Sequence, residues 1–238
     1  MKKIIILFST LYLAIFSTFG QEKIIWDYPV KPGTKEWATF ETGEQMFNAC
    51  QIPSDILSTI STEDLVTVCL NYPLFNDYMA FNDEREGVNV MIKKFNGLWE
   101  LSKRKDGVKE LIKVYTNFPI LSQIQKNITS KDYHIPYKLS FLELVLSDSI
   151  FLSQMDNLEL GELKKIAVSK YADKLQNTNV YSLFSIKKSM LLAAEIIEKQ
   201  NVTEKSVEKQ IIIKTFLENY NNIDSNTLNE ISKIIVGL

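Results

Sequence analysis

Apolar residues recur at helical spacing through most of the chain from Thr42 onward, and this pattern restricts the fold more than any other feature. Leu65, Val66 and Cys69, for example, fall at intervals that place them on one face of a helix. No stretch alternates apolar and polar residues with period two, as a half-buried strand would. The chain is therefore predicted to be all-α, with about ten helices in one domain over residues 41–238.

Residues that cap helices mark where several of these helices begin. Thr42, with Gln45 three positions later, fits a capping box. Pro136 suits the first turn of a helix that we expect to run roughly to Met155. The same kind of reasoning predicts N-caps at Ser61, Ser182 and either Ser225 or Asn226. A sub-boundary between two halves is expected near residue 130.

One segment of the chain recurs. Residues 65–74 (LVTVCLNYPL) align with residues 111–120 (LIKVYTNFPI), and an acidic residue precedes each copy. This offset of 46 residues (from 65 to 111) matches the length of HEAT and armadillo repeats, which are pairs or triplets of helices. The repeat favours an αα-superhelix of this kind, with an extended concave face. An irregular helical bundle is the alternative arrangement.

Residues 1–20 are predicted to be a cleavable signal peptide and not part of the fold. Two lysines precede an apolar run from Ile4 to Phe19, which is the pattern of a secretory signal. The run is shorter and more polar than the about 20 apolar residues that a membrane span needs, although an uncleaved anchor is the alternative. Cleavage is expected before Gln21, and no cysteine follows the run to accept a lipid. We expect a secreted or periplasmic protein without a membrane span.

Composition excludes several kinds of site. One histidine and two cysteines among 238 residues exclude a His-rich metal site and a disulfide-dense scaffold. With 27 basic and 29 acidic residues, the chain lacks the basic footprint of a nucleic-acid-binding protein. No cofactor or metal is expected. His134 is interpreted as a surface or capping residue of a loop, with an acid–base role beside Asp132 as the alternative.

The two cysteines, Cys50 and Cys69, allow two interpretations. In an oxidising compartment they can form one disulfide. Closing a loop of about 20 residues in this way would stabilise the fold by roughly 3 kcal/mol in the chain-entropy model. The alternative is that both are buried free thiols, because cysteine behaves as a small apolar residue in protein cores.

The densest group of carboxylates comprises Asp83, Glu84 and Glu86. Paired carboxylates can hydrolyse glycosidic bonds when a cleft holds them at the right separation, so these residues are the candidate catalytic group. Carboxylate oxygens also bind hard cations. The simpler interpretation is that Asp83 caps a helix and that the two glutamates occupy its first turn.

Aromatic residues supply the candidate ligand-binding positions. Residues 21–40 are expected to form an extended arm whose aromatic side chains, including Trp37, pack onto the body of the domain. Tyr72 and Trp99 follow the apolar stripes of predicted helices, which favours a place in the core. If Trp37, Tyr72 or Trp99 were exposed instead, they would suit stacking on sugar rings or holding a peptide.

Several strings of residues carry a resemblance to other sequences. They are PGTKEW at 32–37, NACQIP at 48–53, ISTEDL at 60–65, CLNYPL at 69–74, FNG at 95–97 and RKD at 104–106. Together they resemble an uncharacterised group of secreted all-helical proteins from Bacteroides-type bacteria, over about residues 26–120. The resemblance implies secretion and an all-α fold. It names no catalytic residue, because that group has no established activity.

The sequence thus favours a non-enzymatic function. We expect a secreted or envelope module that binds a protein or glycan of the cell envelope through a concave helical face. The alternative is a small glycan or peptidoglycan hydrolase that uses the carboxylates near Asp83. A purely structural part of a larger surface assembly is the third hypothesis.

Overall fold

The computed structural model of this chain describes residues 25–120, 135–200 and 206–237, and all regular structure in these ranges is helical. No β-strand occurs in them. The predicted all-α class is therefore confirmed. The described helices number more than the ten or so expected, partly because one long predicted helix is broken into shorter ones.

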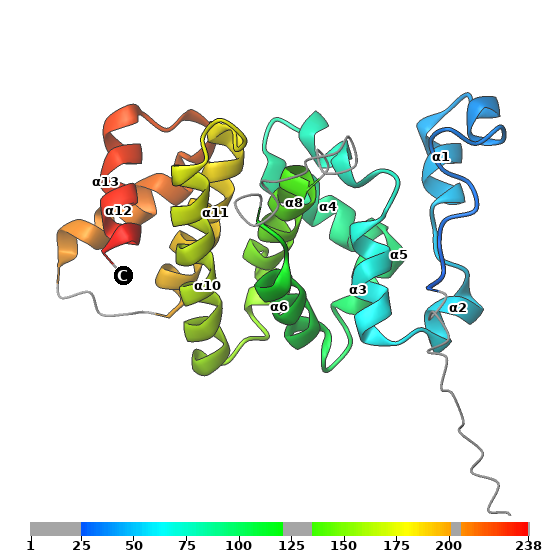
Figure 1. The fold of residues 1–238 in the computed structure, drawn as a ribbon, viewed down its shortest axis with the longest axis horizontal. Helices are drawn as coiled ribbons and strands as arrows, with labels where there is room; N and C mark the ends of the chain where they lie inside the picture. The colour runs from blue at the N-terminus through cyan, green and yellow to red at the C-terminus, as the bar shows by residue number, and fades with distance from the viewer. Residues whose placement is uncertain (1–24, 121–134, 201–205, 238) are drawn as a thin grey trace, which may run out of the picture.

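Figure 1 shows the helices set roughly in chain order along the long axis of the molecule. The α-helices are α1 Gly43–Ala49, α2 Ser54–Thr59, α3 Thr62–Leu70, α4 Glu84–Lys94, α5 Asn96–Leu101, α6 Gly107–Asn117, α8 Ile135–Ser147, α9 Ser149–Leu152, α10 Asn157–Gln176, α11 Leu183–Lys199, α12 Val207–Glu218 and α13 Ser225–Val236. The 3₁₀ helices are η1 Trp37–Thr39, η2 Phe75–Ala80 and η4 Tyr220–Asn222. Helices α1 and α2 lie at one end of the molecule, and α12 and α13 lie at the other.

Helices α8 and α11 form the centre of the core. Helix α8 packs against α4, α6 and α11, and α11 packs against α8, α10, α12 and α13. Residues 139–147 of α8 and residues 190–194 of α11 are buried without interruption. Because consecutive residues point in all directions around a helix, both segments are enclosed on every side.

Local capping rules predicted several helix starts correctly. The capping box of Thr42 and Gln45 is present at α1, and Ser61 caps α3. Ser182 caps α11. These caps depend on side-chain oxygens that accept backbone N–H groups within three residues, so neighbouring sequence is sufficient to specify them.

Two predicted helix boundaries are wrong. The helix expected from Pro136 to Met155 stops at Ser147, because Asp148 adopts an extended conformation and its carboxylate accepts the N–H of Ile150. The last helix is capped by Asp224, whose carboxylate accepts two backbone N–H groups, and not by Ser225 or Asn226. In both cases an aspartate immediately before the helix provides the cap.

The two copies of the repeat occupy α3 and α6, which pack against each other. Arg104 lies just before the second copy and hydrogen-bonds to the end of α2, the helix that precedes the first copy. Its guanidinium donates to the carbonyl oxygens of Leu57 and Ile60, each at 2.8 Å. The repeat therefore corresponds to two neighbouring helices in space, but the HEAT/armadillo-like superhelix is not confirmed.

The described part of the N-terminal arm packs onto the domain. Tyr28 is buried, and its hydroxyl donates to the carbonyl oxygen of Val68 on α3 at 3.1 Å. The Tyr28 ring also meets the rings of Trp26 and Tyr72 edge to face, with centroids 4.8 and 6.1 Å apart. The aromatic residues of the arm thus anchor it, as expected for residues 25–40.

The predicted signal peptide at 1–20 and the predicted sub-boundary near residue 130 both lie outside the described residues. Helices α4 and α6, which precede residue 130, pack directly against α8, which follows it. Among the described helices, none has the length and apolar character that crossing a membrane requires.

Replacing Gly107 with alanine is expected to destabilise the fold by about 1–3 kcal/mol. Gly107 begins α6, and a Cβ there would lie 2.2 Å from the backbone carbonyl oxygen of Leu101. Gly43, which begins α1, is the matched control, since a Cβ there meets nothing within 4 Å. Gly43→Ala should leave stability unchanged or raise it by up to about 1 kcal/mol. Urea unfolding measures both variants, and equal stabilities would contradict the close contact at Gly107.

Candidate functional site

Asp83 is the N-cap of α4 and is held by Arg85. Its carboxylate accepts the backbone N–H of Arg85 at 2.9 Å and the guanidinium at 2.7 Å. Burial raises the pKa of Asp83, but the hydrogen bonds from Arg85 outweigh burial, so this pKa lies below its ordinary value. A general acid of a glycosidase needs a raised pKa, so Asp83 is poorly suited to that role.

The two glutamates of the same group lie in the first turn of α4. Glu84 forms an ion pair with Lys188 of α11, with 2.9 Å between Oε2 and Nζ, whereas the Glu86 side chain is exposed. The interpretation of this group as a helix cap with an acidic first turn is therefore confirmed. Asp83 is thus paired with Arg85 of its own helix, whereas the pair of Glu84 with Lys188 joins α4 to α11, two helices that are far apart in sequence.

The three candidate aromatic residues have different environments. Tyr72 is only 2% exposed, and its ring stacks on Phe95 with centroids 4.0 Å apart, so it offers no face to a ligand and is a core residue. Trp37 is partly buried against the core. Trp99 is 41% exposed, and the ammonium group of Lys103 lies 4.6 Å from its ring centroid. Trp37 lies in η1, Tyr72 follows α3 and Trp99 lies in α5, and none of them lines the grooves that α13 forms with α10, α11 and α12.

Both cysteines are free and buried. Burial raises the pKa of the Cys50 thiol to about 11 and raises that of Cys69 further. Thiols with raised pKa values are weak nucleophiles at neutral pH. Of the two interpretations of the cysteines, the structure shows the buried free thiols and not the disulfide. His134 lies outside the described residues. Within those residues, no group of three or more His, Cys, Asp or Glu side chains is arranged to hold a metal ion.

A cluster of buried polar groups was missed by sequence reasoning. Lys174 of α10 and Glu143 of α8 form an ion pair with 2.6 Å between Nζ and Oε2, and both side chains are 0% exposed. The other oxygen of Glu143 accepts hydrogen bonds from Ser189 at 2.6 Å and from Tyr115 at 3.2 Å. Lys174 also donates to the carbonyl oxygen of Ser185 at 2.9 Å. Because these groups are enclosed, a substrate has no access to the ion pair, and we assign it a structural role.

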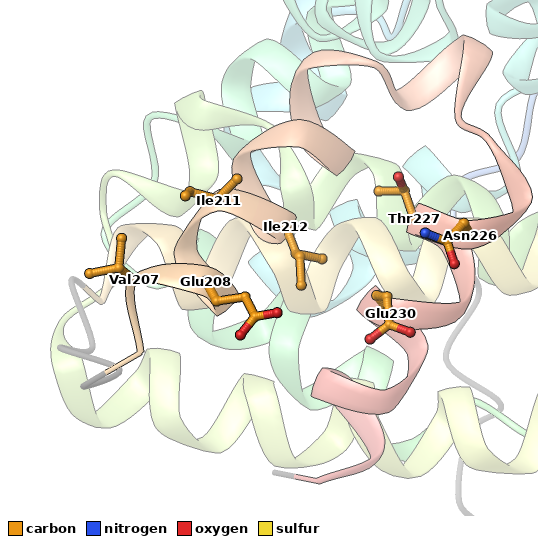
Figure 2. Close-up of a pocket in the computed structure, with 7 residues that line it drawn as sticks. All are labelled: Val207, Glu208, Ile211, Ile212, Asn226, Thr227 and Glu230. Carbon is orange, nitrogen blue, oxygen red and sulfur yellow. The ribbon is translucent and has the colours of Figure 1, made fainter.

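The first groove lies between α12 and α13 and has a volume of about 630 Å³, within the range of about 300–1,000 Å³ that is common for ligand pockets. Figure 2 shows its lining residues, with Ile212 and Glu208 of α12 and Glu230 of α13 extending into the space between the two helices. Its lining is Val207, Glu208, Ile211, Ile212, Asn226, Thr227 and Glu230. Among these residues, the only charged side chains are the two glutamates.

The second groove lies between α10, α11 and the other side of α13, and has a volume of about 360 Å³. Its walls are mostly apolar, with Leu183, Ile186 and Met190 from α11 and Leu228 from α13. At one wall the hydroxyl of Tyr171 hydrogen-bonds with that of Ser232, with 2.6 Å between the oxygens. Helix α13 is therefore a wall shared by both grooves.

Exposed apolar side chains gather near these grooves. Val207 and Ile211 line the first groove, and Leu175 and Leu183 line the second. All four are exposed, as is Phe184 beside Leu183. Exposed apolar side chains at a concave surface are typical of sites that bind another molecule. The two grooves are the candidate functional site.

Sequence reasoning did not identify either groove, although one signal was present. Ile211, Ile212 and Ile213 are consecutive, and three consecutive residues of a helix cannot all face the same core. In the structure Ile213 is buried, Ile212 is partly buried and Ile211 is 59% exposed. On a helix at the end of the molecule, as α12 is, such a run leaves an apolar side chain at the surface, whereas the enclosed helix α8 buries consecutive residues on every side.

No family model, curated protein or solved structure matches this chain. Its function is therefore inferred from its own residues.

Proposed function

We propose that this chain is a secreted or periplasmic protein-interaction module, and that the grooves on the two sides of α13 bind a protein of the cell envelope. The observation that carries the proposal is the exposure of apolar side chains at both grooves. Exposed apolar area is unfavourable in water, and a partner that covers it gains free energy in proportion to the area buried. The proposal replaces the expected extended concave face by two local grooves.

The cellular location in this proposal is supported by the start of the sequence. Two lysines and an apolar run have the pattern of a secretory signal. The two free cysteines are compatible with an oxidising compartment because both are buried. The carboxylates of Asp83 and Glu84 lie in ion pairs, so we do not extend the proposal to a hydrolase.

Retention of a partner by single variants tests the proposal. The secreted chain would be immobilised and exposed to envelope extract, and retained proteins would be quantified by mass spectrometry. Ile211→Ser and Leu183→Ser each remove an exposed apolar side chain from one groove. At least one of them should reduce retention of a specific protein about tenfold, which corresponds to about 1.4 kcal/mol of lost apolar contact.

Leu158→Ser is the matched control for these variants. Leu158 is 72% exposed on α10 and lines neither groove. It should leave retention unchanged, because removing an isolated exposed side chain changes only the solvent-facing surface. Equal retention by the parent and both groove variants would overturn the assignment of the grooves as the binding site.

Removal of residues 1–20 is a separate expected result. Expressed from its own start in a Bacteroides-type host, the protein should be recovered from the periplasm or medium with Gln21 as its first residue, because small residues precede that position. Intact mass spectrometry of the recovered protein measures this directly. Recovery of the full-length chain from the membrane fraction would instead support the uncleaved anchor.

A further inference from the structure

We infer that the groove between α12 and α13 binds a protein segment that carries a basic side chain flanked by apolar ones. This inference rests on the proposed function and adds the chemistry of the partner. It follows from the position of two carboxylates among the apolar side chains of this groove (Figure 2).

The apolar part of the groove specifies the flanking residues of the partner. Val207 and Ile211 are exposed on α12, and Ile212 lies deeper, partly packed against the core. Val207 and Ile211 occur at i and i+4, so they share one face of α12, and Ile212 lies about 100° further round the helix, beside the space between α12 and α13. Side chains of leucine, isoleucine or valine in the partner would be covered by this face.

The charged part of the groove specifies the basic residue. Glu208 comes from α12 and Glu230 from α13, so the groove has one carboxylate on each side, and none of the described residues that line it is basic. A lysine or arginine of a partner can approach both carboxylates. Charge complementarity of this kind selects partners and excludes acidic ones.

The lysine that pairs with Glu230 leaves part of this carboxylate accessible. Lys233 of α13 lies 2.7 Å from Oε1 of Glu230, and the Lys233 side chain is largely exposed. A carboxylate has two oxygens and about four acceptor sites, so one exposed lysine does not saturate it. An exposed pair of this type contributes little free energy and is easily replaced by a partner's cation.

The mixture of apolar and acidic side chains favours a protein segment over a membrane surface. Membrane-binding surfaces carry lysine or arginine beside their apolar face, because bilayer surfaces are anionic. The charged residues of this groove have the opposite sign. The lining also includes the amide of Asn226 and the hydroxyl of Thr227, which can bond to a peptide backbone.

Short peptides test the chemistry directly. The probes are Ser-Leu-Lys-Leu-Ser, the same peptide with glutamate at the centre, and the same peptide with serine at the centre, all with blocked ends. Binding to the secreted chain would be followed by nuclear magnetic resonance. The lysine peptide should shift the signals of Ile212 and Thr227 and bind about tenfold more tightly than the serine peptide, while the glutamate peptide should not bind.

Glu208→Gln and Glu230→Gln keep the size of each side chain and remove its charge. Each should reduce the preference for the lysine peptide several-fold and weaken its dependence on salt. Glu162→Gln is the control, because Glu162 lies on α10 and lines neither groove. It should change neither the preference for the lysine peptide nor the dependence of binding on salt. Equal binding of the three peptides to the parent chain would overturn the inference.

The failure of this inference is distinguishable from failure of the proposed function. If Ile211→Ser abolishes retention of an envelope protein but the lysine peptide has no advantage, the interaction module stands and the basic segment is overturned. If the groove variants retain the partner fully and no peptide shifts the signals of Ile212 or Thr227, both proposals are overturned.

Discussion

Replacing Lys174 with methionine is expected to lower the free energy of unfolding by about 3–5 kcal/mol, because it leaves the buried carboxylate of Glu143 without its cation. Burial lowers the pKa of Lys174, and the charge of Glu143 counteracts this effect. The ammonium group lies 2.6 Å from Glu143 and 2.9 Å from the carbonyl oxygen of Ser185, so the substitution also removes a donor from Ser185. Denaturant unfolding at neutral pH measures the loss.

The double variant Lys174→Met, Glu143→Leu provides the decisive comparison. Replacing both charges of a buried pair by apolar groups avoids the desolvation penalty, so the double variant should recover much of the lost stability. Full recovery is not expected, because Ser189 and Tyr115 lose their acceptor when Glu143 is removed. The free energies of unfolding lost by Lys174→Met alone and by Glu143→Leu alone are the reference. If these two losses simply add in the double variant, the two residues are not energetically coupled in the way that their geometry implies.

The location of this ion pair shows where sequence reasoning reached its limit. Lys170 and Lys174 follow Leu163 and Ala167 at helical spacing, so they fall on the same face of α10 as these two apolar residues. A pattern of apolar residues alone cannot show that a lysine is buried, because its partner Glu143 lies 31 residues away on another helix. Contacts between distant helices determine this part of the core.

Local features were predicted more successfully for the same reason. The capping box at Thr42 and the cap at Ser61 involve atoms within three residues, and Asp83 was interpreted correctly as a cap before Glu84 and Glu86. The grooves depend on how α13 packs beside α11 and α12, so no short motif encodes them. The candidate site therefore came from the structure and not from a motif.

The protein is expected to unfold at about pH 12, because its buried tyrosines resist ionisation. Burial is the largest cause in each case, and it raises their pKa values above the ordinary value. The residues are Tyr28, Tyr72, Tyr78, Tyr115 and Tyr220. Above about pH 10 an unfolded tyrosine loses its proton while a buried one keeps it. The folded state then binds more protons, so stability that is fully present below about pH 10 falls as the pH rises.

Tyr220→Phe isolates one group from this effect. Each such tyrosine contributes about 1.4 kcal/mol per pH unit to the fall, so the variant should lose stability less steeply by that amount above about pH 10. The Tyr220 hydroxyl is buried and has no hydrogen-bond partner among the described residues, so stability at neutral pH should be unchanged or slightly higher.

Tyr115→Phe is the matched comparison for this variant. Tyr115→Phe should make the fall of stability with pH less steep by the same amount. It should also lower the free energy of unfolding at neutral pH by about 1 kcal/mol, because the Tyr115 hydroxyl donates to Glu143. Lysines and exposed groups titrate alike in parent and variants, so the difference between two urea-unfolding series from pH 7 to 12 reports only the tyrosine that was removed. Parallel curves for the parent and Tyr220→Phe would mean that Tyr220 ionises in the folded protein, contrary to its burial beside Arg85 of α4, Lys187 of α11 and Phe216 of α12.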